Sequence, residues 1–406
     1  MPKLYFLFLS VLRCAIRNAP VPEHLECSEK EWSDLFYLAS KHDVQPLIMN
    51  VLYKCNSLCQ YSDLYDEMMR YARKVTIFQA AHTADFLLLY KEMNKAGLYP
   101  LVLKGLICRN LYETPELRFS VDEDLFIKAD DIQIYNDFLC NHGFVLADET
   151  MDIQSAYEVS YHNQDSGLYL EVHKHLFPPE DSAYGYLNHL FNDLDGSITI
   201  KIYGTNIHTL NYTDHFLYLI THAFKHIIYS GIGIRQICDI ALFAETYGKY
   251  IDWSNVLSLC TEYHLNTFLY AVLIICKKYY DMDISCISFP LQDIDEKPLL
   301  LDILSGGTYG AADENRLHSA TMTLRAVSAE QNEVKSNGIL RSLFPDASYM
   351  KQKYPYLKQH EWLLPAAWGQ RIFEYAVHRN KKTNPVKSIE IGKKRIELLK
   401  TYGILK

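Results

Sequence analysis

The chain has 406 residues, of which 49% are hydrophobic and 22% charged, an ordinary composition for a folded protein with a sizeable core. Its net charge of −9 argues against a broad nucleic-acid-binding surface, which would carry an excess of Lys and Arg. A single nucleotide is not excluded, because one basic pocket and a metal ion can hold a triphosphate.

The ten cysteines include no Cys-x-x-Cys pair, which indicates reduced thiols in a cytoplasmic protein rather than a disulfide framework. Residues 4–12 form an apolar run that resembles part of a secretory signal. Arg13 ends this run early and no Ala-x-Ala cleavage site follows, so a buried first helix is expected. No segment reaches the roughly 18–20 apolar residues of a membrane span, and no membrane partner is expected.

Residues 1–97 are predicted to form an N-terminal helical region. Four apolar residues recur at the i, i+3, i+4 and i+7 spacing of one helix face: Phe86, Leu89, Tyr90 and Met93. Gly97 is suited to end this helix.

Residues 98–210 mix strand and helix patterns. Short apolar stretches predict strands at residues 99–103, 121–127, 168–173 and 197–203. Helices are predicted at residues 106–112 and 132–142. The expected fold class is therefore α+β, with a small mixed sheet between helical regions.

Residues 211–406 are predicted to form a C-terminal helical region. Thr213 or Asp214 can cap a helix whose apolar face reaches Ile227. Further helices are predicted at residues 254–280 and 385–402, with a loop at residues 306–313.

Asp122 and Asp124 alternate along the predicted strand 121–127, so both side chains share one face, with Cα atoms roughly 6–7 Å apart. Carboxylates this close repel each other unless a cation lies between them. Mg²⁺ takes such oxygen ligands and fills its shell with water and phosphate oxygens. An Asp-x-Asp pair alone is a weak signal, because acidic pairs are common at strand ends.

Two neighbouring segments strengthen the metal interpretation. Gly105 follows the first predicted strand and would let the backbone approach a phosphate. Glu171 adds a third acid within the apolar strand 168–173, although a solvent-facing position is its alternative. This order of glycine, paired aspartates and glutamate is what a two-metal phosphoryl-transfer site requires.

Three stretches resemble the uncharacterised nucleotidyltransferase family of the polymerase-β-like superfamily: Leu103-Lys104-Gly105, Arg118-x-x-x-Asp122-x-Asp124-Leu125 and Leu170-Glu171-Val172-His173. Looser similarities extend from about residue 35 to 375. They comprise residues 39–47, 222–226, Arg235, 239–241, 343–345, 354–355 and 363–365.

The resemblance implies a polymerase-β-like catalytic core in which Asp122, Asp124 and Glu171 are the catalytic and metal-binding acids. It implies Mg²⁺ or Mn²⁺ as cofactor and an NTP as substrate. The modest net charge favours a hydroxyl acceptor on a small molecule, sugar or protein over long nucleic acid. Two positions depart from the family pattern. Leu106 stands where Ser or Gly usually follows the glycine, and Glu123 stands at a usually apolar position and must find a partner.

Three residues are predicted to bind the nucleotide: Lys104, Gly105 and Arg118. Lys104 can pair with the triphosphate as a point charge, or it can be a solvated lysine at a strand end. Arg118 can contact phosphate, or it can neutralise Asp122 and Asp124.

Four further residues are predicted to line the cleft: His173, His222, Lys225 and His226. His222 and His226 lie four positions apart and could bind zinc, but no carboxylate follows at the zincin spacing. Arg235 and Asp239 are also four positions apart, and they could be no more than an ion pair along one helix.

Two other functions stay open at this point. Leu106 and Glu123 leave room for a non-catalytic nucleotide-binding or regulatory protein on the same fold. The alternation of Glu171, His173 and His175 could form a metal hydrolase site on one strand face, but it leaves the aspartate pair unexplained.

Overall fold

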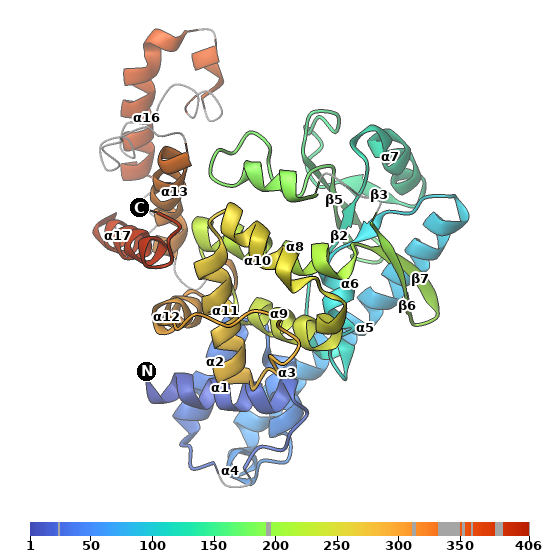
Figure 1. Ribbon diagram of the computed structural model, residues 1–406, viewed down its shortest axis with the longest axis vertical. Helices are drawn as coiled ribbons and strands as arrows, with labels where there is room; N and C mark the ends of the chain where they lie inside the picture. Colours follow the sequence, from blue (N-terminus) through green and yellow to red (C-terminus); the bar gives the residue numbers. More distant parts are fainter. Residues whose placement is uncertain are drawn as a thin grey trace.

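The computed structural model describes residues 1–22, 25–191, 196–310, 314–331, 350, 354–358, 360–377 and 385–405. Helices form both ends of the chain, and a small sheet lies between them in the sequence (Figure 1). This arrangement confirms the α+β fold class predicted from the sequence.

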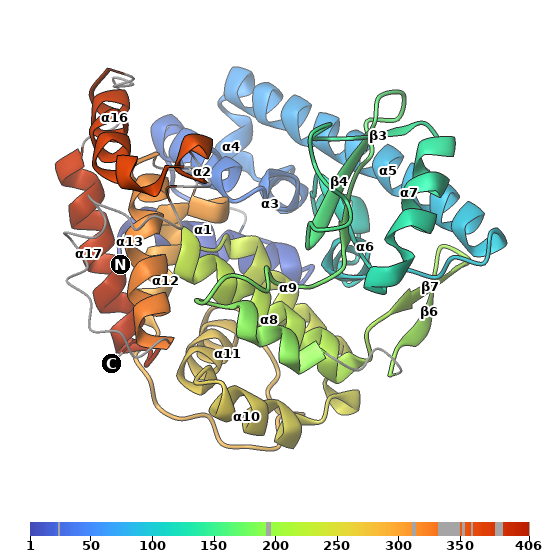
Figure 2. The ribbon, with the colours of Figure 1, turned by 90° about the horizontal axis from the view of Figure 1, so that it is seen from above.

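Among the described residues, five helices precede the first strand: α1 (Lys3–Ile16), α2 (Glu29–Lys41), α3 (Gln45–Leu52), α4 (Asn56–Cys59) and α5 (Ser62–Lys95). Phe8 and Leu12 of α1 are fully buried, which confirms the expected first helix. Ser28 and Glu31 form a capping box at the start of α2. α5 is 34 residues long and extends from the N-terminal helices to the strands (Figures 1 and 2).

The main sheet has the strand order β1-β2-β5-β4-β3. Its strands are β1 (Leu101–Val102), β2 (Asp122–Phe126), β3 (Phe144–Leu146), β4 (Glu158–Asn163) and β5 (Tyr169–His173). β2 and β5 pair in parallel, and the other neighbours pair antiparallel. A separate antiparallel pair consists of β6 (Ile198–Ile202) and β7 (Thr205–Thr209).

The predicted strands are confirmed as β1, β2, β5 and β6, although β6 lies outside the main sheet. The predicted helices of this region are α6 (Lys104–Arg109), which begins two residues earlier than expected, and α7 (Ile132–Asn141). No strand is predicted from the sequence at β3, β4 or β7.

Eight α-helices are described after β7: α8 (Tyr212–Tyr229), α9 (Ile234–Tyr247), α10 (Trp253–Glu262), α11 (Asn266–Tyr280), α12 (Lys297–Gly306), α13 (Glu314–Gln331), α16 (Leu364–Val377) and α17 (Pro385–Thr401). The described 3₁₀ segments are Pro115–Leu117, Ala129–Asp131, Gly185–Phe191, Gly248–Tyr250, Thr308–Gly310, Pro355–Lys358 and Glu361–Leu363.

Two helix predictions in this region were wrong in detail. Asn211 caps α8 by accepting the backbone N–H of Asp214, so the cap is neither Thr213 nor Asp214. The single helix expected at 254–280 is divided, because His264 adopts a left-handed backbone (φ 57°) between α10 and α11. Of the loop predicted at 306–313, residues 311–313 lie outside the described residues.

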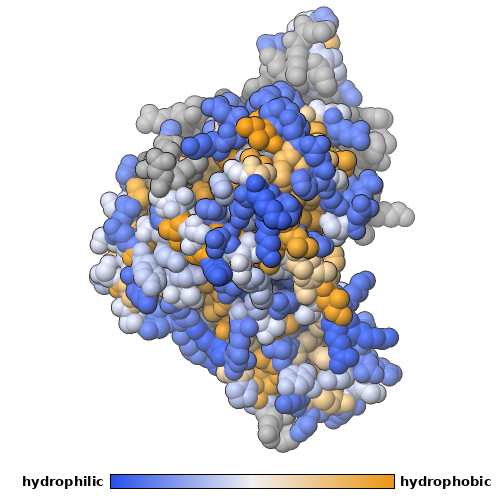
Figure 3. Space-filling model, turned by 90° about the vertical axis from the view of Figure 1, so that its right-hand side faces the viewer, coloured by the Kyte–Doolittle hydropathy of each residue, from blue (hydrophilic) through white to orange (hydrophobic). Residues whose placement is uncertain are grey.

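One hydrophobic cluster runs through all three regions of the chain, from Phe8 in α1 to Leu399 in α17. The boundaries at residues 97 and 210 therefore stay a prediction. None of the described helices is both long enough and apolar enough to cross a membrane. On the face drawn in Figure 3, hydrophilic residues predominate and hydrophobic residues form smaller patches.

Candidate functional site

The parallel pairing of β2 with β5 places Asp124 directly beside Glu171. His173 follows Glu171 by two residues and shares its face of β5. One ligand atom from each of Asp124, Glu171 and His173 lies within 4.8 Å of the other two, so these residues could hold a metal ion. We call these three residues the candidate cation site. Asp122 shares the face of β2 with Asp124 but is not part of this group.

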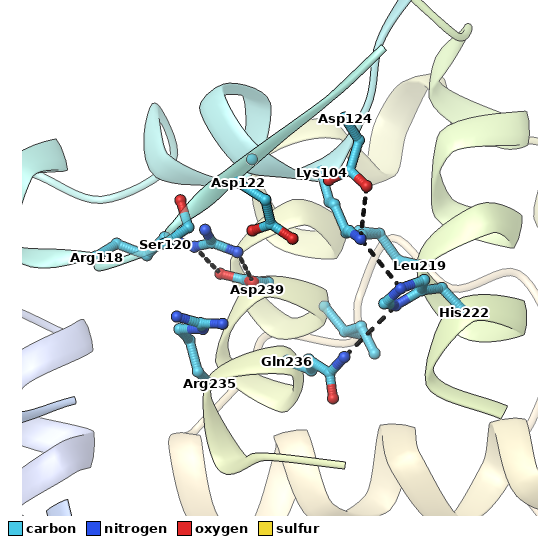
Figure 4. A pocket seen from close by; sticks show the side chains of 12 residues that line it. Lys104, Arg118, Ser120, Asp122, Asp124, Leu219, His222, Arg235, Gln236 and Asp239 are labelled. Carbon is cyan, nitrogen blue, oxygen red and sulfur yellow. Dashed lines mark hydrogen bonds and ion pairs between the residues drawn. The ribbon is translucent and has the colours of Figure 1, made fainter. Parts of the chain in front are cut away.

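A pocket adjoins this site between β2 and α6 on one side and α8 and α9 on the other (Figure 4). Asp122 and Lys104 extend into it opposite Arg235 and Gln236 of α9. We call it the basic pocket, after three cationic residues in its lining. The lining residues are Lys104, Gly105, Arg118, Ser120, Asp122, Asp124, Leu219, His222, Arg235, Gln236, Asp239 and Ile240.

Lys104 connects the basic pocket to the candidate cation site. Its Nζ donates to Asp124 Oδ1 at 2.9 Å and lies 3.1 Å from Nε2 of His222. Its side chain is only 14% exposed, so Lys104 is not the solvated lysine of the alternative interpretation. Burial alone would raise the pKa of Asp124, but Lys104 and His173 outweigh it and hold that pKa below its ordinary value.

The pKa of Glu171 is shifted in the opposite direction. Burial raises the pKa of Glu171 to about 8, and the carboxylates of Asp124 and Glu158 act in the same direction. Its side chain is 24% exposed and faces Asp124, so the solvent-facing alternative does not apply. Two adjacent carboxyl groups that resist joint ionisation fit a position for a cation.

Arg118 is anchored to α9 rather than to the strand acids. Its Nε and Nη2 donate to Asp239 at 3.2 and 2.6 Å, and the hydroxyl of Tyr112 donates to the same carboxylate at 2.9 Å. The acid that Arg118 neutralises is thus Asp239, and not Asp122 or Asp124. Both partners of this ion pair are buried.

Asp239 therefore pairs with Arg118, and not with Arg235 as the spacing along the helix suggests. Arg235 instead donates to the carbonyl of Phe119 and lies 3.9 Å from Asp43. Among the described residues that line the basic pocket, two buried guanidinium nitrogens lack hydrogen-bond partners: Nη1 of Arg118 and Nε of Arg235. The lining of the basic pocket therefore contains cationic N–H groups that have no partner in the described part of the chain.

Glu123 lies on the opposite face of β2 and is fully buried. It forms an ion pair with Arg109, and its Oε2 accepts the backbone N–H of Leu106 at 2.9 Å. Arg109 is the partner that a charged residue at position 123 is expected to need. The same carboxylate fills the space where a Cβ of residue 105 would lie, so contact with Glu123 explains Gly105. The approach of Gly105 to a phosphate stays a prediction.

Of the four residues predicted to line the cleft, His222 lines the basic pocket and His173 belongs to the candidate cation site. The Nε2 atoms of His222 and His226 lie 3.1 Å apart, and burial lowers the pKa of both rings well below the ordinary value. Lys225 lies over the ring of Tyr157. Among the described residues, the group that could hold a metal includes neither His222 nor His226, which weighs against the zinc alternative.

Three residues near the site were not predicted as functional: Glu158, Arg235 and Gln236. Glu158 lies on β4 opposite His173, and no local motif marks it. The sequence places Arg235 within the family resemblance and predicts for it only an ion pair with Asp239. His175, part of the hydrolase alternative, lies beyond the end of β5 and is exposed.

A small mixed sheet that carries acids on adjacent strands, with helices around it, is the arrangement expected of a nucleotidyltransferase core. The model of the uncharacterised nucleotidyltransferase family matches residues 28–281, and the chain belongs to this family. The similarities noted at residues 343–345, 354–355 and 363–365 lie beyond the matched range, and residues 343–345 also lie outside the described residues. No curated protein and no solved structure matches the chain.

Proposed function

We propose that this protein transfers a nucleoside monophosphate from an NTP to a hydroxyl acceptor with the help of a divalent cation. The observation that supports this best is the pairing of Asp124 with Glu171 on adjacent strands, next to the basic pocket. The acids would hold the cation, and the pocket would hold the triphosphate. A cytoplasmic location, suggested by ten free cysteines, is part of the proposal.

The residues present fit a divalent cation. Oδ2 of Asp124 is buried and has no hydrogen-bond partner in the described part of the chain. In the proposal, Asp124 acts together with Glu171 on the neighbouring strand β5 and with Asp122 on its own strand β2. The bound ion would neutralise triphosphate charge and favour ionisation of the acceptor hydroxyl.

Three cationic side chains of the basic pocket would bind the triphosphate: Lys104, Arg118 and Arg235. The same lining also holds the carboxylates of Asp122, Asp124 and Asp239. The unpaired nitrogens of Arg118 and Arg235 are suited to phosphate oxygens, since N–H groups of a guanidinium form strong bonds with anions. This adds Arg235 to the nucleotide-binding residues predicted from the sequence.

In the proposed reaction the acceptor oxygen forms a bond to the α-phosphorus, and the bond from this phosphorus to pyrophosphate breaks. The proton of the acceptor hydroxyl passes to a carboxylate, for which Glu171 is the candidate. The chain contributes mainly positioning and charge neutralisation. Its net charge of −9 favours a small molecule, sugar or protein as acceptor over long nucleic acid.

The test is transfer of label from NTPs radiolabelled at the α-phosphate, with Mg²⁺ or Mn²⁺ and acceptors from cell extract. We expect transfer by the wild type and none by the double variant Asp122→Ala/Asp124→Ala. The matched control is Asp130→Ala/Asp131→Ala, in the segment that directly follows β2. Transfer by the site variant contradicts the proposal. Nucleotide binding without any transfer supports the non-catalytic alternative.

A further inference from the structure

The candidate cation site combines carboxylates with an imidazole ring. Nε2 of His173 lies 3.1 Å from Oδ1 of Asp124 and 3.8 Å from Oε2 of Glu171. The ring is buried, with 4% of the residue exposed. A cation placed among these atoms would therefore contact two carboxylates and one ring nitrogen.

The opposite side of the ring faces a further carboxylate. β4 pairs antiparallel with β5 and places Glu158 opposite His173. Oε2 of Glu158 lies 3.4 Å from Nδ1 of His173, although Nδ1 lacks the alignment of a hydrogen bond to any described residue. In the tautomer with the ring proton on Nδ1, that proton would face the carboxylate of Glu158. The lone pair of Nε2 is then available to a metal.

We propose that His173 binds the cation through Nε2, that Glu158 positions its ring, and that the site prefers Mn²⁺ or a similar transition-metal ion to Mg²⁺. That the ion takes part in catalysis rests on the proposed function, whereas the preference for Mn²⁺ follows from the ligand atoms. Mg²⁺ favours oxygen ligands and retains its waters, while an imidazole nitrogen suits transition-metal ions.

An independent feature supports a cation here rather than a closed network of hydrogen bonds. Asp124 is fully buried, yet its Oδ2 has no hydrogen-bond partner among the described residues. A buried carboxylate oxygen without a partner is costly, and a bound cation would remove that cost. If His173 served only as a hydrogen-bond donor to Asp124, the cation ligands would all be oxygens.

The experiment uses Mn²⁺ alone as the probe on the full chain, with pulsed electron paramagnetic resonance to detect nitrogen bound to the ion. The wild type should show nitrogen coupling and should bind Mn²⁺ about tenfold more tightly than Mg²⁺. His173→Asn should abolish the coupling and weaken Mn²⁺ binding by roughly 10–100-fold. His175→Ala is the matched control, because His175 is exposed beyond the end of β5.

Glu158→Gln tests the positioning role and does not depend on His173→Asn folding correctly. It should weaken Mn²⁺ binding by roughly 10–100-fold while nitrogen coupling persists. Mn²⁺ bound without nitrogen coupling, and no more tightly than Mg²⁺, overturns the role of His173 but leaves nucleotidyl transfer possible. Absence of any bound cation together with absence of transfer overturns both proposals. Nitrogen-coupled Mn²⁺ without transfer upholds the role of His173 and counts against the proposed function.

Discussion

Lys104 lies where a bound cation and a bound nucleotide would influence each other. Its ammonium is 2.9 Å from Asp124 Oδ1, and an ammonium at this distance opposes a metal ion on the same carboxylate. In the basic pocket the same charge would attract a triphosphate. The two roles predict opposite effects of removing the charge.

We expect Lys104→Met to tighten Mn²⁺ binding without nucleotide by roughly tenfold, because a repulsive charge is lost. The same variant should weaken binding of a non-hydrolysable NTP analogue by roughly tenfold. Calorimetric titration measures both affinities. Lys128→Met, exposed just after β2, is the control and should change neither. Weaker binding of both ligands would show that Lys104 only maintains the shape of the site.

Glu123 and Arg109 form a fully buried ion pair behind the candidate cation site. Glu123→Gln would leave the guanidinium of Arg109 in the interior without a compensating charge. We expect the free energy of unfolding to fall by about 3–5 kcal/mol, measured by chemical denaturation. Glu113→Gln changes an exposed glutamate of the same segment and should have an effect within about 0.5 kcal/mol. A loss as small as that of the control would contradict the predicted cost.

At the scale of elements, α6 packs on β2 through the contact between Gly105 and Glu123. A Cβ at Gly105 would overlap Oε2 of Glu123, whereas one at Gly369 in α16 has no atom of the described residues within 4 Å. Gly105→Ala should therefore lower the free energy of unfolding by roughly 1–3 kcal/mol. Gly369→Ala should raise it by roughly 0.5–1 kcal/mol, because alanine favours a helix. Equal effects in chemical denaturation would show that α6 can move away from β2 freely.

The sequence predicts β2 from the alternating Asp122 and Asp124 that precede an apolar stretch, and β5 from the apolar residues on both sides of Glu171. It does not predict β4, in which only Val159 and Tyr161 are buried, too few to show a period. The register that brings Glu158 to His173 depends on pairing between strands. Local patterns do not determine that pairing.

The same limit applies to the site. The approach of Asp124 and Glu171 is predictable from two strands that carry acids, and their pairing confirms it. Arg118 lies close in sequence to Asp122 but pairs with Asp239, 121 positions away, because helix packing brings α9 to it. Contacts of this kind follow from the tertiary fold and leave no signal in local sequence.

At the scale of the whole molecule, His42 joins three distant helices. Nδ1 of His42, just after α2, accepts the backbone N–H of Ile234 in α9 at 3.2 Å. Nε2 lies 3.3 Å from the carbonyl of Leu304 in α12. The ring must be neutral at Nδ1 to accept, and burial lowers the pKa of His42 to about 4.

This lowered pKa links folding to pH. The unfolded chain gains a proton on His42 near the ordinary pKa of 6.5, but the folded protein resists it until about pH 4. The contribution of His42 to the free energy of unfolding is therefore complete above pH 6.5 and is lost as the pH falls toward 4. Over this range the loss should be roughly 3 kcal/mol.

We expect His42→Asn to be less stable than the wild type at pH 7 but to lose roughly 3 kcal/mol less between pH 7 and pH 4, because no ring remains to be protonated. Chemical denaturation at both pH values measures the difference. His175→Asn should follow the wild-type profile, since His175 is exposed. His215 is also buried, with its pKa lowered to about 3, and its contribution cancels between variant and wild type. An equally large loss of unfolding free energy in His42→Asn between pH 7 and pH 4 would exclude His42 as the group responsible for this pH dependence.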